Sequence, residues 1–304
     1  MTVSSLTPTE LAARLKRGLF LRTGAFTVKL QTTIPNVSEG VRLLYADYPL
    51  ASEDFADFHV SLSRPFNLRR WFKPQVWFRL EGIAPFQPLP YDQSFPLLEW
   101  GLNWCVSYHA NSYLMIHAAV VEKDGHAAIL PAPPGSGKST LCAALVNRGW
   151  RLLSDELTLI RLSDGAIVPL PRPVSLKNAS IDVIKKFVPT AVFSRAVDDT
   201  LKGTVAHMKP SADSVVRAGE TAKPGWIIFP QYQADAATRL EAIPPSRAFM
   251  RVADNAFNYS QLGQCGFEAL AALIDQSAAY DFTYSVLDEA IAAFGALQAP
   301  APRP

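Results

Sequence analysis

The segment from Pro131 to Thr140 constrains the fold of this chain more than any other feature. It contains Gly137-Lys138-Ser139, follows the apolar run Ala127–Leu130 and precedes a helix-like run, Leu141–Arg148. A buried strand, a glycine-rich turn and a helix in this order are the context of a phosphate-binding loop. The first glycine of the usual pattern is replaced by Ala132, at the exit of the strand. We therefore expect an α/β fold in which a strand of the sheet ends in this loop.

Each part of this loop has a physical role in holding a nucleoside triphosphate. Gly135 and Gly137 let backbone N–H groups turn toward a phosphate, and the start of the helix adds partial positive charge. Lys138 supplies a mobile charge to the β- and γ-phosphate oxygens, and Ser139 offers its hydroxyl to Mg²⁺. Pro133 and Pro134 lack N–H groups, so phosphate binding has to rest on the second half of the loop. The predicted nucleotide-binding residues are Gly135, Ser136, Gly137, Lys138, Ser139 and Thr140.

Two adjacent carboxylates follow the next apolar strand. Asp155 and Glu156 come directly after Arg151–Ser154, and Asp155 lies 17 residues after Lys138. A carboxylate pair at a strand end beside a phosphate-binding loop can hold Mg²⁺ with one group and accept the proton of an attacking hydroxyl with the other. We therefore expect a phosphoryl-transfer site that uses ATP, or another nucleoside triphosphate, together with Mg²⁺.

The composition argues against several other classes of protein. The chain has 304 residues, of which 49% are hydrophobic and 18% charged, so it can bury a core and does not belong to the disordered class. Its formal net charge of +2 gives no case for a nucleic-acid partner. The three cysteines form no Cys-x-x-Cys pair, which argues against a structural zinc site. No apolar run reaches the roughly 18 residues of a membrane span, and no signal peptide is visible, so we expect a cytoplasmic protein without a membrane span.

The chain divides into two predicted domains and a short tail. Four early segments have strand-like composition between Pro, Gly and Asp residues: Phe26–Leu30, Val41–Tyr45, Phe58–Leu62 and Val76–Leu80. We expect residues 1–90 to form a small β-rich N-terminal domain, residues 91–298 a nucleotide-binding domain, and residues 299–304 a flexible tail. The predicted class is α/β, or α+β when the whole chain is considered.

The spacing of the motifs resembles the HPr serine kinase/phosphorylase family. The resemblance is carried by Ile116-His117-Ala118-Ala119, by Gly137-Lys138-Ser139 and by the run from Arg148 to Glu156. His117 precedes Lys138 by 21 residues, as in that family. The resemblance implies a P-loop core of the HPr kinase/carboxykinase type, in which Asp155 is the general base, and Ser139, Glu156 and Asp155 serve Mg²⁺. It also implies that His117 lies beside Asp155 or the γ-phosphate.

A closer resemblance covers nearly the whole chain. Segments such as Tyr45–Leu50, Leu98–Trp104, Pro171–Asn178 and Lys202–His207 are typical of the HPr-kinase-related kinase A group. That group occurs in bacteria with exosortase-type protein sorting and is encoded beside a small PqqD-like protein. The resemblance implies a PqqD-like protein or a peptide as a partner, and homo-oligomers are frequent among relatives of the HPr kinase.

The sequence also departs from the HPr enzymes. Thr140 stands where they have Glu, and Glu156 stands where they have Asp. Their later Glu-x-Arg-Gly signature is not visible, and the segment Lys202–Pro210 occupies its place. These departures argue against phosphorylase activity and against HPr as the acceptor.

The leading hypothesis is a serine kinase-like P-loop phosphotransferase that acts on a hydroxyl of a peptide, a small protein or a metabolite. A transferring γ-phosphate needs cations around it, and among the basic residues after the acidic strand we favour Arg172 and Lys202. Asp155, His117, Lys138, Lys202 and Arg172 are the predicted catalytic residues. Two alternatives stay open: a non-catalytic nucleotide sensor or scaffold in a protein-sorting or peptide-modification system, and a carboxykinase-like enzyme.

Overall fold

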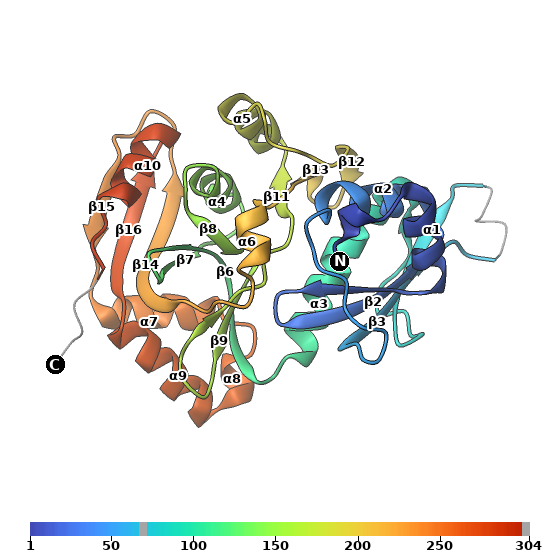
Figure 1. Cartoon of the computed structure of the whole chain (residues 1–304). Coiled ribbons are helices and arrows are strands. Elements are labelled where there is room, and N and C mark those ends of the chain that lie inside the picture. Colours follow the sequence, from blue (N-terminus) through green and yellow to red (C-terminus); the bar gives the residue numbers. More distant parts are fainter. Residues whose placement is uncertain (67–71, 300–304) are drawn as a thin grey trace.

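The computed structural model describes residues 1–66 and 72–299. Helices and strands alternate through most of the chain, and the described strands form three sheets. Figure 1 shows the N-terminal third on one side and most of the segments after residue 110 on the other. The predicted mixed α/β class is confirmed.

An eight-stranded mixed sheet forms the centre of the larger part of the molecule. Its strands follow the order β10-β9-β6-β7-β14-β16-β15, and β8 pairs with β6. β6 is antiparallel to β7, β8 and β9, whereas β14 is parallel to both β7 and β16. The strands are β6 (Tyr113–Lys123), β7 (His126–Pro131), β8 (Arg151–Ser154), β9 (Leu157–Arg161), β10 (Ile167–Val168), β14 (Lys223–Tyr232), β15 (Arg239–Ala242) and β16 (Ala278–Tyr284).

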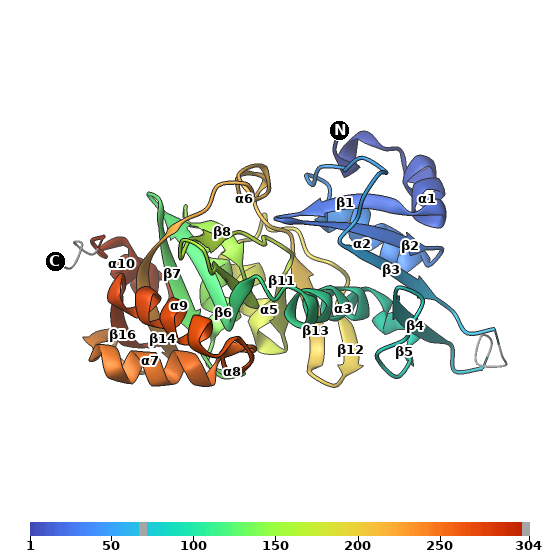
Figure 2. The same ribbon diagram turned by 90° about the horizontal axis from the view of Figure 1, so that it is seen from below.

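Helices cover both faces of this sheet, because alternate residues of its buried strands point in opposite directions. Ala128 and Leu130 of β7 pack in one apolar cluster with α4, α5 and α10, whereas Ala127 and Ile129 pack in another with α7 and α9. Figure 2 shows these layers from below. The helices are α4 (Lys138–Val146), α5 (Ala179–Phe187), α7 (Pro245–Asp254), α8 (Tyr259–Leu262), α9 (Gln264–Asp275) and α10 (Leu287–Gly295).

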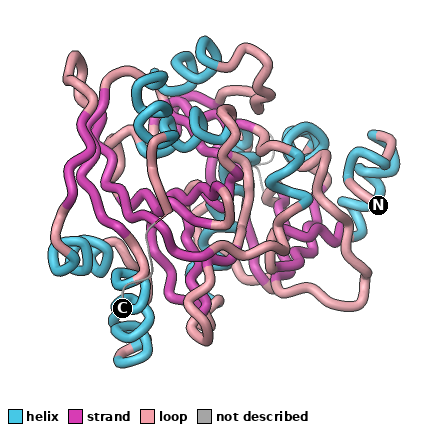
Figure 3. The backbone as a smooth tube through the Cα atoms, turned by 60° about the vertical axis from the view of Figure 1, so that its left-hand side comes forward, coloured by secondary structure: helices cyan, strands magenta, loops and turns pink. Residues whose placement is uncertain are grey.

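A second, five-stranded sheet belongs to the N-terminal segment. Its strands follow the chain in order, and it packs with the first three α-helices in one apolar cluster. In Figure 3 the long strands of the large sheet lie apart from this smaller sheet near the N-terminus. The elements are η1 (Val3–Ser5), α1 (Pro8–Arg17), β1 (Leu19–Thr23), β2 (Phe26–Thr32), α2 (Pro35–Leu44), β3 (Phe58–Ser63), β4 (Gln75–Leu80), β5 (Leu89–Pro90), η3 (Tyr91–Gln93) and α3 (Ser94–His109).

The strand predicted at Val41–Tyr45 is wrong. These residues end the helix α2 and its cap. Val37, Val41 and Leu44 are fully buried at helical spacing, and Pro35 occupies the first turn, where its missing N–H costs nothing. The β-branched and aromatic composition of this segment is weaker evidence than its periodicity.

A three-stranded sheet lies between the two larger ones. It consists of β11 (Val174–Lys177), β13 (Gly203–Met208) and β12 (Val197–Thr200) in this order, and the short helix α6 (Ala212–Val216) follows it. Lys209 forms an ion pair with Asp47 at 2.7 Å, and the Tyr48 hydroxyl donates to the carbonyl oxygen of Pro171 at 2.6 Å. These bonds connect the N-terminal segment to the strands beside the predicted site.

Within the part of the chain that the structure describes, every helix is too short or too polar to cross a membrane.

Candidate functional site

The glycine-rich loop joins the end of β7 to the start of α4 and has the backbone shape that a phosphate-binding loop requires. Gly135 and Gly137 have φ angles of 88° and 87°, which favour glycine. A Cβ on Gly137 would lie 2.5 Å from the Tyr284 hydroxyl oxygen, which donates a hydrogen bond to the Gly137 carbonyl at 3.0 Å. The Tyr232 N–H donates to the Ser136 carbonyl at 2.9 Å. Two tyrosines at the ends of β14 and β16 therefore fix the second half of the loop.

Lys138, at the first position of α4, carries a buried ammonium group. The residue is 8% exposed, and its Nζ has no hydrogen-bond partner among the described residues. The Ser136 hydroxyl in the same loop is likewise buried and unpaired within ranges 1–66 and 72–299. An unpaired buried ammonium is costly for the fold. The Lys138 ammonium lies beside a helix N-terminus and the backbone N–H groups of the loop, so it is suited to an anionic ligand such as a phosphate.

The acidic pair lies at the same edge of the sheet as the loop. β6 pairs with both neighbours, so that Ala118 faces Pro131 of β7 and Val120 faces Ser154 of β8. The ends of β7 and β8 therefore lie at a similar level on either side of β6. The predicted strand before Asp155 is confirmed, since β8 ends at Ser154.

Asp155 is 4% exposed and is held by only one of its two oxygens. Its Oδ2 accepts from the Ser175 backbone N–H at 3.0 Å, whereas Oδ1 is buried and lacks a hydrogen-bond partner in the described segments. The backbone bond fixes the carboxyl group in place. The second oxygen is therefore positioned to accept a proton or to approach a cation.

The two adjacent carboxyl groups have opposite pKa shifts. Burial, with the charge of Glu156 acting in the same direction, raises the pKa of Asp155 to about 6; the charge of Lys138, the Ser175 N–H and the Ser139 hydroxyl oppose this rise. Burial also acts on Glu156, but the hydrogen bond from His117 and the charges of Lys138 and Lys202 hold its pKa below the ordinary value. Carboxyl groups whose environments separate their pKa values can divide the roles of proton acceptor and permanent anion.

His117, on β6, contacts the second carboxylate of the pair. Its Nε2 lies 3.1 Å from Glu156 Oε2. The His117 backbone N–H donates to the Asn255 carbonyl at 2.8 Å, and its ring lies 5.7 Å from that of Phe257. The segment after α7 thus holds β6 at the level of the site. His117 orients Glu156.

The two predicted cationic residues, Arg172 and Lys202, are held beside the site by different contacts. Arg172 is buried, and its Nη2 donates to the Glu99 carbonyl at 3.2 Å and to Asn103 Oδ1, both on α3. Lys202 lies on the loop before β13, with its Nζ 5.4 Å from the centre of the Trp100 ring. Burial lowers the pKa of Lys202, and the charge of Glu156 opposes that shift. Both cations lie around the acidic pair, and Arg172 is the more rigidly held.

A small cavity beside Asp155 contains residues that the sequence analysis did not select. Arg172 and Asp155 line it together with Glu99 and Trp100 of α3, Ser175 of β11 and His207 of β13. Each of these residues carries at least one buried side-chain nitrogen or oxygen without a hydrogen-bond partner in the described part of the chain. They come from elements far apart in the sequence, so no local motif identifies them.

The oxygen donors of this site suit Mg²⁺. The Glu156 carboxylate, the unpaired Asp155 Oδ1 and the Ser139 hydroxyl are hard oxygen ligands, and Mg²⁺ is usually held by one or two carboxylates together with substrate phosphates. Within residues 1–66 and 72–299 there is no cluster of three or more His, Cys, Asp or Glu that could hold a metal by itself.

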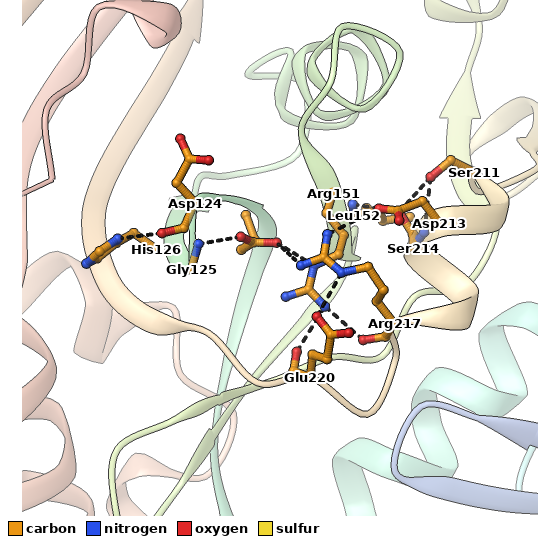
Figure 4. A network of polar contacts seen from close by, with 11 residues as sticks. Asp124, Gly125, His126, Arg151, Leu152, Ser211, Asp213, Ser214, Arg217 and Glu220 are labelled. Atoms are coloured by element: carbon orange, nitrogen blue, oxygen red, sulfur yellow. Dashed lines mark hydrogen bonds and ion pairs between the residues drawn. The ribbon is translucent and has the colours of Figure 1, made fainter.

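The opposite edge of the same sheet carries a second buried charge cluster, shown in Figure 4. Arg151, at the start of β8, forms an ion pair with Glu122 at the end of β6, and both side chains are 3% exposed. Arg151 Nη1 also donates to the carbonyls of Arg217 and Glu220 at 2.8 and 3.0 Å. Glu122 accepts from the Gly125 N–H at 2.6 Å. This cluster is saturated by partners from its own chain.

The comparisons with known proteins are limited in extent. Residues 100–175, which include the loop and the acidic pair, match the model of a family described as the SynChlorMet cassette protein ScmC. The solved HPr(Ser) kinase/phosphatase from Coxiella burnetii is 12% identical, with 60% of this chain and 95% of that chain covered and a TM-score of 0.23. No curated protein matches the sequence. At this identity and TM-score the likeness assigns no activity to this chain.

Proposed function

We propose that this protein is a P-loop phosphotransferase that moves the γ-phosphate of ATP, or another nucleoside triphosphate, to a hydroxyl group. One observation carries the proposal. At the edge where β7 and β8 end, a buried ammonium and a buried carboxyl oxygen, Lys138 Nζ and Asp155 Oδ1, both lack a hydrogen-bond partner among the described residues. A nucleotide phosphate and an attacking hydroxyl would supply the two missing partners.

The proposed reaction relies on positioning and charge. The N–H groups from Gly135 to Thr140 and the Lys138 ammonium hold the phosphates. Asp155 Oδ1 accepts the proton of the acceptor hydroxyl while its Oδ2 stays bonded to the Ser175 N–H. The hydroxyl oxygen bonds to the γ-phosphorus, the bond to the β,γ-bridging oxygen breaks, and the nucleoside diphosphate leaves. Lys202 and Arg172 offset the negative charge around the transferring group.

Glu156 and Ser139 would hold Mg²⁺, which supplies charge neutralisation to the phosphates, and Asp155 Oδ1 stays free to accept the proton. His117 keeps the Glu156 carboxylate oriented through the contact at 3.1 Å. Because the pKa of Glu156 is held low, this carboxylate stays ionised across the physiological pH range. It is therefore suited to a permanent charge rather than to proton transfer.

We also propose a class of partner and an organisation for the chain. The acceptor bears a hydroxyl, and the PqqD-like protein or peptide implied by the resemblance is one candidate. Residues 1–90 and 91–298 form two domains, and the protein is a cytoplasmic homo-oligomer.

The function can be tested with ATP labelled at the γ-phosphate, Mg²⁺ and a panel of hydroxyl compounds and peptides. We expect transfer by the unaltered protein. In Asp155→Asn, the rate should fall about 10³-fold because proton acceptance is lost, while nucleotide affinity stays within a few-fold. Asp182→Asn removes an exposed carboxylate in the first turn of α5 and serves as the matched control.

Two results would contradict the proposal. Tight nucleotide binding without transfer to any acceptor would favour a sensor or scaffold. Undiminished transfer in Asp155→Asn would show that another group accepts the proton.

A further inference from the structure

The cavity beside Asp155 is lined by two residues of opposite charge, Glu99 and Arg172, and each has one polar atom without a hydrogen-bond partner in the described residues. Glu99 Oε1 accepts from the Tyr45 hydroxyl at 2.7 Å, whereas Glu99 Oε2 has no hydrogen-bond partner within the described residues. Arg172 Nη2 donates hydrogen bonds to the Glu99 carbonyl and to Asn103 Oδ1. Arg172 Nη1 is buried and has no hydrogen-bond partner within the described residues. Glu99 Oε2 and Arg172 Nη2 are 3.9 Å apart, so the two charges attract each other without a direct hydrogen bond.

These atoms indicate which charged groups a ligand of this cavity would carry. Arg172 Nη1 can donate to a carboxylate, and guanidinium groups are well suited to that geometry. Glu99 Oε2 can accept from an ammonium group. Burial raises the pKa of Glu99 against the opposing effect of Arg172, and a cationic ligand would favour its ionised form. Asp155 Oδ1, in the same cavity, can accept from a hydroxyl.

The remaining walls are also polar and buried. Trp100 Nε1 can only donate a hydrogen bond, and burial lowers the pKa of His207 to about 3, so its ring is neutral and offers one donor and one acceptor. The free space is about 10 Å³, which is room for roughly one water molecule. A folded protein surface cannot enter such a space. A compact molecule larger than water needs more room, so its binding requires the α3 side chains that line the cavity to move aside.

We propose that the acceptor is a free hydroxy amino acid of the L-serine class, bound as a zwitterion. Its carboxylate pairs with Arg172, its ammonium with Glu99, and its hydroxyl donates to Asp155. The inference rests on the proposed phosphotransferase function and narrows the acceptor to one class. In the reaction, the serine hydroxyl oxygen bonds to the γ-phosphorus and its proton passes to Asp155. The nucleoside diphosphate leaves, and the product is an O-phospho amino acid.

Direct binding tests the inference independently of catalysis. Isothermal titration calorimetry of the full chain with Mg²⁺ and ADP would compare L-serine with three analogues. These are 3-hydroxypropanoate, which lacks the ammonium, ethanolamine, which lacks the carboxylate, and N-acetyl-L-serinamide, which lacks both charges. Charge-assisted hydrogen bonds contribute enough that each single deletion should weaken binding about 10- to 100-fold. N-acetyl-L-serinamide should not bind measurably.

Glu99→Gln sharpens the assignment, because the amide oxygen can still accept from Tyr45 while the charge is lost. We expect this variant to bind L-serine about tenfold more weakly and 3-hydroxypropanoate with unchanged affinity. Asp92→Asn, an exposed carboxylate just before α3, is the matched control. The ratio between two ligands on one variant does not depend on how much of the protein is folded, and the analogue series needs no variant at all.

The outcomes separate this inference from the proposed function. Transfer to N-acetyl-L-serinamide or to peptides, without preference for free L-serine, would overturn the inference and leave the phosphotransferase standing. Absence of binding by L-serine, L-threonine and L-homoserine would overturn it too. Binding of L-serine with the expected analogue pattern, but without phosphate transfer, would support the binding site and contradict the phosphotransferase.

Discussion

Both edges of the large sheet bury charged groups, but only one of them supplies all of these groups with hydrogen-bond partners among the described residues. At one edge, Arg151 and Glu122 pair with each other and with three backbone groups (Figure 4). At the other edge, Lys138 Nζ and Asp155 Oδ1 are buried without hydrogen-bond partners in the described part of the chain. The strand β8 connects the two edges, because Arg151 begins it and Asp155 directly follows its last residue.

The difference separates a structural role from a binding role. Nearly all buried polar groups in folded proteins are hydrogen-bonded, and each exception calls for an explanation. Most of the buried polar atoms without a hydrogen-bond partner in the described residues belong to the phosphate-binding loop, its Lys138 or the cavity beside Asp155. Function and stability commonly conflict at sites where buried charges await a ligand. The saturated edge should therefore stabilise the fold, and the unsaturated edge should destabilise it.

The largest expected effect is at the saturated edge. Changing Glu122→Gln leaves the buried Arg151 guanidinium without its counter-ion, and breaking a buried pair in this way costs about 3–5 kcal/mol. Urea unfolding followed by tryptophan fluorescence would measure the loss. Glu220→Gln, at an exposed carboxylate of the same network, should cost less than about 1 kcal/mol. A loss below about 1 kcal/mol in Glu122→Gln would contradict the structural role of this edge.

The same acid-to-amide change should have the opposite sign at the unsaturated edge. The pKa of Asp155 is raised from 3.8 to about 6, so its ionised form is disfavoured in the folded protein. Asp155→Asn keeps an oxygen for the Ser175 N–H and should stabilise the protein at pH 8 by about 2–3 kcal/mol. Glu156→Gln is the control, and because the pKa of Glu156 is lowered, this variant should lose stability. Equal losses in both variants would remove the contrast between the edges.

The pH dependence follows from the same shift. A carboxyl group whose folded pKa lies above its unfolded value binds its proton more tightly in the folded state, so stability rises as the pH falls from about 6 toward 4. The advantage of Asp155→Asn should therefore shrink over that interval. Phosphate transfer should fall about tenfold per pH unit below about pH 6, because the protonated carboxyl cannot accept the hydroxyl proton. A transfer rate that is flat from pH 7 to pH 4.5 would exclude Asp155 as the base.

The sequence predicts the phosphate-binding loop and the acidic pair of the unsaturated edge, but it indicates few of the residues that line the cavity. The loop is recognisable because its glycines, its lysine and its flanking elements are contiguous, and the strand before Asp155 is indicated by the short segment Arg151–Ser154 with its two leucines. The pairing of β6 with both β7 and β8 brings these two segments together, and this long-range contact is not visible in local patterns.

The cavity depends on tertiary packing. In the sequence, Glu99 is a polar residue in a mostly apolar helical segment and His207 a single histidine in a short strand, and neither pattern indicates a site. Their convergence on Arg172 requires α3 to pack beside β11 and β13. The error at Val41–Tyr45 has a similar origin, since composition favoured a strand where helical spacing and Pro35 determine the structure.

The smallest expected effect concerns the support of the loop. The Tyr284 hydroxyl donates to the Gly137 carbonyl at 3.0 Å, and its ring packs on Phe282. Tyr284→Phe removes the hydrogen bond and keeps the ring, so unfolding stability should fall by about 1 kcal/mol. Nucleotide affinity should fall only a few-fold, because the Tyr232 N–H still holds the Ser136 carbonyl. Tyr280→Phe, at the other end of β16, controls for loss of a hydroxyl. If Tyr284→Phe instead abolished nucleotide binding while Lys138→Ala did not, phosphate capture would depend on the shape of the loop more than on its charge.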